Sequence, residues 1–139
     1  MSSPATPRLA TDAFLVREYD EAIAFFVDRL GFTLRDDTDL GDGNRWVVVA
    51  PSGQDGAALL LSRATSPEAE QAVGRQGGGR VWLFLETDDF ARDHAAFTAR
   101  GVCFAESPRD ESYGRVAVFE DLYGGRWDLI QPAGARSQG

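Results

Sequence analysis

The chain has 139 residues, of which 43% are hydrophobic and 26% charged, a composition typical of a single globular domain. Fourteen basic residues against 22 acidic ones give a formal net charge of −8, which disfavours nucleic-acid binding, because a protein that binds phosphates needs a basic face. The N-terminal residues contain no long apolar run and Cys103 is the only cysteine, so we expect no signal peptide, no membrane span, no disulfide and a cytoplasmic location.

The first half of the chain is expected to contain a strand, a helix and three further strands. Apolar residues at helical spacing indicate the helix, with Asp20 as its N-cap and Gly31 as the glycine that ends it. Glycine and aspartate at 40–44 favour a hairpin turn. The acidic run around that turn, Asp36, Asp37, Asp39 and Asp42, is interpreted as a solvated loop. The strands are expected at 10–16, 32–34, 45–50 and 57–62.

After a polar linker at 63–79, the second half is expected to repeat this order of elements. A strand at 80–86 precedes a helix from about 89 to 100. Further strands are expected at 102–105, 115–120 and 126–131, with a hairpin loop at 106–114. The sequence thus predicts one α+β domain of two tandem βαβββ modules, at about 10–62 and 80–132, forming an eight-stranded curved sheet with a cleft.

The two halves also correspond residue by residue. Neither half can bury its apolar face alone, so the two must pack against each other. The corresponding pairs are Tyr19 with Phe90, Phe26 with Phe97, Arg29 with Arg100 and, at a spacing shorter by one residue, Gly31 with Gly101 and Leu59 with Leu129.

Three stretches of this repeat are similar to motifs of one known family. Residues 14–22, followed by Leu30-Gly31-Phe32, are similar to its opening strand, helix and turn, residues 85–90 to its second opening, and residues 119–129 to its closing strand. Taken in order, they resemble the vicinal oxygen chelate superfamily, which includes glyoxalase I, extradiol dioxygenases and bleomycin-resistance proteins. The resemblance implies paired βαβββ modules, a cavity in the curved sheet and usually a homodimer.

The resemblance also implies four equivalent positions whose side chains hold a divalent metal. In this chain they are Thr11, Ala58, Trp82 and Asp128. Alanine and tryptophan are not ligands for such metals, a threonine hydroxyl is a weak one, and Asp128 alone is not a site. We therefore expect no metal and no cofactor.

Aromatic and acidic side chains stand where a metal is implied. Alternation along the strand puts Trp82, Phe84 and Glu86 on one face, where the rings form a platform and the carboxylates add negative charge. The sequence thus predicts a metal-independent small-molecule binding protein of the bleomycin-resistance type, which sequesters an aromatic, cationic or polar-aromatic compound such as an antibiotic. The expected ligand-binding residues are Thr11, Ala58, Trp82, Phe84, Glu86, Arg126 and Asp128.

Two other hypotheses stay open. One is a metal-dependent lyase, isomerase or dioxygenase with an unusual ligand set, in which Thr11, Glu86 and Asp128 surround a hard cation. The other is an interaction module whose cavity is filled by its own aromatic side chains. Two further residues are interpreted as structural: His94 as a partly buried histidine of the second helix, and Cys103 as an inert buried thiol.

Overall fold

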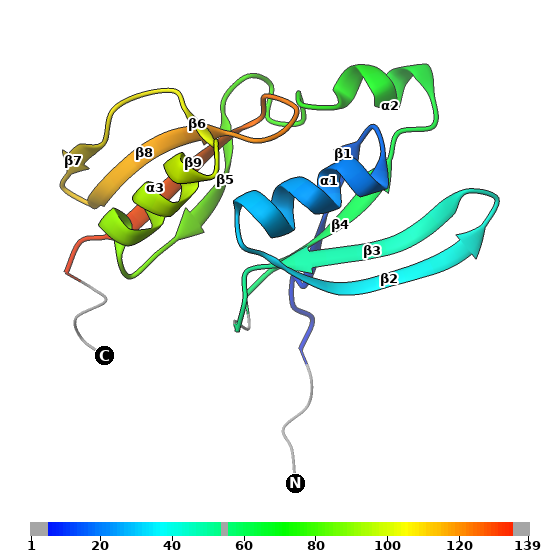
Figure 1. The fold of residues 1–139 in the computed structure, drawn as a ribbon, viewed down its shortest axis with the longest axis horizontal. Helices are drawn as coiled ribbons and strands as arrows, with labels where there is room; N and C mark the ends of the chain where they lie inside the picture. The colour runs from blue at the N-terminus through cyan, green and yellow to red at the C-terminus, as the bar shows by residue number, and fades with distance from the viewer. Residues whose placement is uncertain (1–5, 54–55, 135–139) are drawn as a thin grey trace, which may run out of the picture.

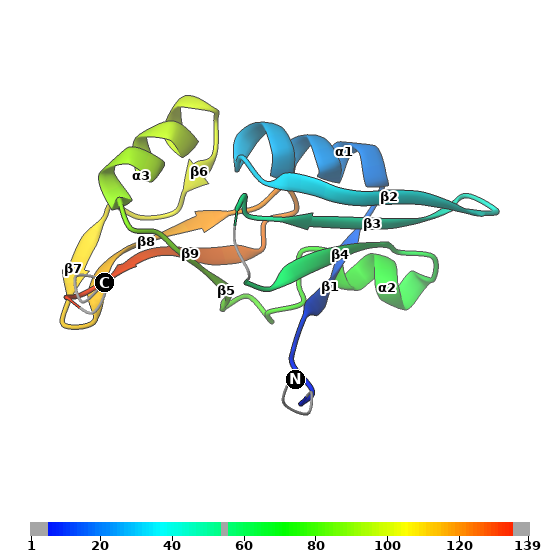
Figure 2. The same cartoon turned by 90° about the horizontal axis from the view of Figure 1, so that it is seen from below.

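The computed structural model of the chain describes residues 6–53 and 56–134. These residues form two mixed β-sheets, and the helix that follows the first strand of each sheet packs on the same side (Figure 1, Figure 2). The first sheet has the order β1-β4-β3-β2 and contains β1 (Thr11–Val16), β2 (Thr33–Gly41), β3 (Asn44–Ala50) and β4 (Ala58–Arg63). The second has the order β5-β9-β8-β6, with β7 also paired to β8, and contains β5 (Val81–Glu86), β6 (Cys103–Phe104), β7 (Arg109–Glu111), β8 (Gly114–Glu120) and β9 (Arg126–Pro132).

The two sheets and their helices have the same layout. In each, the first and last strands are parallel neighbours, β1 with β4 and β5 with β9. One helix follows the first strand: α1 (Tyr19–Ala24), which continues into the π-helical turn η1 (Phe25–Arg29), or α3 (Phe90–Ala99). We call β1–β4 with α1 and η1 the first module, and β5–β9 with α3 the second module. This layout confirms the predicted α+β fold of paired βαβββ units.

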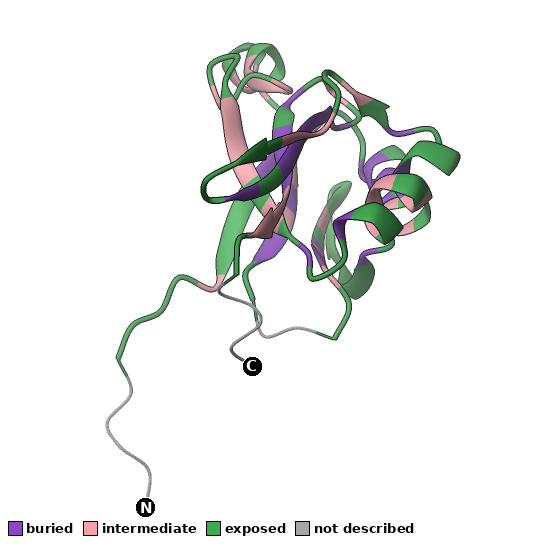
Figure 3. Cartoon of the chain, turned by 90° about the vertical axis from the view of Figure 1, so that its left-hand side faces the viewer, coloured by how far each residue is buried: buried purple, intermediate pink, exposed green. Residues whose placement is uncertain are grey.

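The two modules share one hydrophobic core, in which buried residues gather on the strands and on the helix sides that face them (Figure 3). Trp127 of β9 is at its centre. The centroid of its ring lies 6.5 Å from that of Phe14, 6.0 Å from that of Phe26 and 6.3 Å from that of Phe32, all in the first module. The ring centroid of Phe119, in its own module, is 5.5 Å away. The core is therefore continuous across the module boundary.

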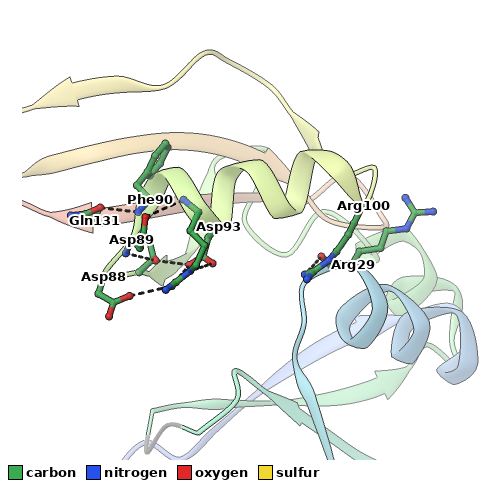
Figure 4. A network of polar contacts seen from close by, with 9 residues as sticks. Arg29, Asp88, Asp89, Phe90, Asp93, Arg100 and Gln131 are labelled. Atoms are coloured by element: carbon green, nitrogen blue, oxygen red, sulfur yellow. Dashed lines mark hydrogen bonds and ion pairs between the residues drawn. The ribbon is translucent and has the colours of Figure 1, made fainter.

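Polar contacts at the rim also join the modules. The Tyr123 hydroxyl donates to Glu21 over 2.5 Å and accepts the backbone N–H of Arg17 at 3.2 Å. At the ends of the two helices, Arg29 donates to the carbonyl of Gly101 and Arg100 donates to the carbonyl of Arg29, each over 3.4 Å (Figure 4). This reciprocal pair follows from the sequence repeat.

The predicted start of the first helix was wrong. The helix begins at Tyr19 after Glu18, which makes no side-chain cap, and Asp20 bonds Arg45 at 2.9 Å instead of capping the helix. The α3 helix does have a side-chain cap, because Asp89 accepts the backbone N–H of Arg92.

The acidic run expected in a loop lies mainly on the exposed strand β2. The turn Asp42–Gly43 has positive φ at both residues, 57° and 79°, the conformation of a two-residue hairpin turn, so β2 pairs with β3 up to Gly41. Charges on an exposed edge strand also disfavour pairing with other chains.

Three smaller expectations differ from the structure. The linker contains a helix, α2 (Pro67–Ala72), capped by the Ser66 side chain, and the expected loop at 106–114 contains the strand β7. Cys103 is exposed, not buried, because Phe104 takes the core-facing position of the two-residue strand β6. His94 is half-buried between the rings of Phe90 and Phe104, as expected.

Candidate functional site

The strands present one face to the shared core and another away from it, which we call the outer face. Cross-strand partners lie on the same face of a sheet, so the register of the second module identifies the outer-face residues. They include Phe84 and Glu86 of β5, Val116 and Val118 of β8, and Arg126, Asp128 and Ile130 of β9. In the first module they include Thr11 and Ala13 of β1, Trp46 and Val48 of β3, and Ala58 and Leu60 of β4.

The register shows which residues of the two modules are equivalent. Thr11 pairs directly with Ala58, and in the second module Phe84, not Trp82, pairs directly with Asp128. The prediction that Trp82 lies on the same face as Phe84 was therefore wrong. The cause is a β-bulge between Val81 and Leu83, which interrupts the alternation that the prediction assumed.

Trp82 consequently packs against the core. Its ring stacks on Phe14 with centroids 5.8 Å apart and an interplanar angle of 21°. Phe84 is different, because 64% of it is exposed. The exposed aromatic platform is therefore the ring of Phe84, while Trp82 stabilises the contact between modules.

Asp128 is a buried carboxylate whose bonding is incomplete. It is 7% exposed, and its Oδ1 atom is buried without a hydrogen-bond partner among the described residues. Burial raises the pKa of the Asp128 carboxyl, and the positive charge of Arg109 on β7 offsets this only in part. An unsatisfied buried polar atom is rare in proteins and costs about 1–3 kcal/mol.

Asp121 provides an internal comparison for Asp128, because it is also buried. Its carboxylate accepts hydrogen bonds from the backbone N–H groups of Tyr123 and Gly125 and from the Trp127 indole, at 2.9, 3.0 and 2.9 Å. These bonds hold the turn before β9, so Asp121 has a structural role. Asp128 has no such role in the described structure.

The structure divides the predicted ligand residues into groups. Phe84, Glu86, Arg126 and Asp128 share the outer face of the second module, where Arg126 also lies 4.0 Å from Glu120. Thr11 and Ala58 lie on the outer face of the other sheet. The prediction missed Arg109, whose charge acts on Asp128 from the segment expected to be a loop. The sequence left the direction of Trp46 undecided; it lies on the outer face and is 45% exposed.

Comparisons with known proteins agree with this architecture. The model of the glyoxalase/bleomycin resistance protein/dioxygenase superfamily matches residues 8–129. The chain belongs to this superfamily. A protein from Shewanella frigidimarina, described only as uncharacterized, is 52% identical over 120 residues, covering 86% of this chain and 89% of the relative.

Solved structures of the superfamily have the same fold. TnmS3, an antibiotic binding protein from Streptomyces sp. CB03234, is 31% identical, with a TM-score of 0.77 over 94% of this chain and 100% of TnmS3. A glyoxalase/bleomycin resistance protein from the same organism is 32% identical, with a TM-score of 0.67 over 88% of this chain and 99% of that protein. Within the described residues, no helix is long and apolar enough to cross a membrane.

The donor set does not fit the metal that the superfamily resemblance implies. With Phe84 in place of Trp82, the four equivalent positions hold one carboxylate, one hydroxyl and two side chains without donor atoms. No group of three or more His, Cys, Asp or Glu residues suited to a metal occurs in the part of the chain that the structure describes. A catalytic site for such a metal needs about three protein ligands, so no reaction step is assigned to a metal here.

Proposed function

We propose that this protein is a metal-independent small-molecule binding protein of the bleomycin-resistance type, which holds an aromatic ligand against the outer face of its second module. The observation that carries the proposal is the cross-strand pair of Phe84 and Asp128: an exposed ring beside a buried carboxylate whose Oδ1 atom has no donor within residues 6–53 and 56–134. Because the two residues are direct partners on neighbouring strands, they offer a ligand a ring and a carboxylate side by side.

Each member of the pair selects a chemical feature of the ligand. The Phe84 ring favours a planar aromatic group, which stacks at a centroid distance of about 4.5–7 Å. An N–H or O–H group on the ligand supplies the partner that Asp128 lacks, and a bond to an ionised carboxylate contributes about 1.5–3 kcal/mol. Because the torsion of a carboxylate about its last bond is broad, either oxygen can turn toward that donor.

The comparison with TnmS3 supports the class of function. That protein is an antibiotic binding protein and shares 31% identity with nearly the whole of this chain. We infer an antibiotic-like aromatic ligand bearing an amine or hydroxyl group. The homodimeric, cytoplasmic form expected from the sequence belongs to the same proposal, with Trp46 as an exposed apolar residue that an assembly would cover.

A fluorescence titration with a matched pair of aromatic compounds tests this proposal. Doxorubicin carries an amino sugar on a planar ring system, and its aglycone lacks that amine. We expect doxorubicin to bind more tightly than the aglycone, and Asp128→Asn to weaken doxorubicin binding about tenfold or more. The exposed substitution Asp36→Asn is the matched control and should leave the affinity unchanged. Equal affinities of wild-type protein and Asp128→Asn for doxorubicin, or no binding of either compound, would contradict the proposed role.

Metal independence needs its own measurement. Elemental analysis of tag-free protein purified without chelator should find far less than one transition metal per chain, because one carboxylate and one hydroxyl hold such ions poorly. Near-stoichiometric zinc, iron, nickel or manganese would favour the metal-dependent enzyme instead.

A further inference from the structure

A cavity lies between the two modules on the core side of the sheets. It has a volume of about 700 Å³, within the range of small-molecule sites. Its apolar wall includes Phe32 and Leu59 from the first module and Leu85 and Phe97 from the second. These residues belong to the core face of their elements, and Asp128 does not line the cavity. We call this cavity the inter-module groove; it touches the outer-face site only along the edge strand β5, through Phe84 and Glu86.

The rim of the groove carries an excess of negative charge. Glu86, Asp88 and Asp93 line it, and Arg92 is the one basic residue that lines it in the part of the chain that the structure describes. The Arg92 guanidinium lies 3.1 Å from Asp88 and 3.0 Å from Asp93, so its charge is already shared between two carboxylates at the start of α3 (Figure 4).

Asp93 stays ionised despite its position. Burial pushes the pKa of the Asp93 carboxyl upward, but hydrogen bonds from Arg92 and from the Thr87 hydroxyl, the latter 2.5 Å long, outweigh burial and hold the pKa below its usual value. Asp93 therefore keeps its negative charge at neutral pH. A groove with apolar walls and an acidic rim concentrates positively charged ligands.

We infer that the inter-module groove is a second binding site, for an amphipathic cation whose flat apolar ring enters between the modules while its positive charge stays at the rim. The apolar walls disfavour a small inorganic cation, and the acidic rim disfavours an anionic ligand of the same size. This site goes beyond the proposed function, because its walls lie on the opposite side of the sheets from Asp128.

Gly56 provides a way to block the groove without straining the fold. It lines the groove, and a Cβ atom added there meets no atom of the described residues within 4 Å. Gly56→Trp therefore places a large side chain in the groove. Ser112→Trp adds the same side chain at an exposed turn outside the groove and is the matched control. Thermal unfolding of both variants checks that each is folded.

Proflavine, a planar aromatic cation, is the probe, and anilinonaphthalene sulfonate, an aromatic anion, is its counterpart. We expect Gly56→Trp to weaken proflavine binding about tenfold or more, and Ser112→Trp to leave it unchanged. Removing rim charge with Glu86→Gln and Asp88→Asn should weaken binding about two- to fivefold, while Asp42→Asn, an acidic residue outside the groove, should not. The sulfonate should bind more weakly than proflavine.

Several results would overturn the inference. Unchanged proflavine affinity in Gly56→Trp would do so, and so would equal affinity for the two probes. If Asp128→Val abolishes proflavine binding while Gly56→Trp preserves it, the cation binds to the outer face and not to the groove. If light scattering shows that Gly56→Trp converts a dimer to monomers, the groove is occupied by a second copy of this chain. Equal doxorubicin affinity of the wild-type protein and Asp128→Asn, with proflavine binding as expected, contradicts the proposed function alone.

Discussion

The two modules have the same backbone layout but different outer faces. At one ladder position the first module places Thr11 opposite Ala58, while the second module places Phe84 opposite Asp128. The core side is apolar in both, with Phe14 and Leu61 in the first module and Phe119 and Leu129 in the second. The repeat therefore preserves the residues that pack the modules together, and the chemistry of the candidate site is concentrated in the second module.

The largest predicted effect tests whether the two modules form one folding unit. Trp127→Ala removes a side chain that contacts three aromatic residues of the other module, so it should lower the free energy of unfolding by about 3–5 kcal/mol in a single transition. Urea denaturation followed by circular dichroism measures this. Trp46→Ala, the same change at a half-exposed site, should lower the free energy of unfolding much less. Two separate transitions in the Trp127 variant would show that the modules unfold independently.

The two buried aspartates should respond in opposite directions to the same substitution. Asp128→Val removes an incompletely bonded carboxylate from a β-strand and should raise the free energy of unfolding by about 1–3 kcal/mol, while abolishing ligand binding. Asp121→Val leaves three N–H donors without their acceptor and should lower it by at least about 2 kcal/mol. Chemical denaturation at pH 7 measures both. Loss of stability in both variants would mean that the Asp128 carboxylate has a hydrogen-bond partner in solution.

The gain from Asp128→Val should depend on pH. Burial raises the pKa of Asp128 in the folded state, so the folded protein binds this proton more tightly than the unfolded chain does. The ionised carboxylate therefore destabilises the fold above its folded pKa, and this penalty is lost as the pH falls toward the unfolded value of about 3.9. Denaturation at a series of pH values should show the full gain above the folded pKa of Asp128 and a gain that declines as the pH falls below it. A gain in the free energy of unfolding that does not change with pH would contradict burial of the Asp128 carboxylate as its cause.

The comparison of modules also shows what the sequence could predict. The two-copy frame followed from the correspondence between the two halves of the sequence, because neither half can bury its apolar face alone. The position of Asp128 followed from the resemblance to the superfamily. The orientation of Trp82 did not, since a β-bulge adds a residue without a distinctive sequence signal. The inter-module groove was not predictable either, because it is formed by segments as distant in sequence as Phe32 and Phe97.

Tyr123 joins the modules through its hydroxyl, and its removal should have a smaller effect than the core change. Tyr123→Phe loses the bond to Glu21 and should lower the free energy of unfolding by about 1 kcal/mol at pH 7. Burial and the bond to Glu21 raise the pKa of Tyr123, so the stabilisation is present below the unfolded value of about 10 and lost as the pH rises further. Denaturation at pH 7 and pH 11 should show the difference shrinking at the higher pH, with Tyr113→Phe, an exposed tyrosine, as the control.

The smallest predicted effect concerns the symmetric arginine pair at the helix ends. Arg29→Ala and Arg100→Ala each remove one exposed, 3.4 Å bond to a backbone carbonyl, so each should change the free energy of unfolding by less than about 0.5 kcal/mol. Because Arg29→Ala keeps the Arg29 carbonyl that Arg100 uses, the two changes should add in the double variant. Urea denaturation of both single variants and the double variant measures the coupling. A coupling energy above about 0.5 kcal/mol would mean that this contact holds the modules together; near-zero coupling assigns that role to the aromatic core around Trp127.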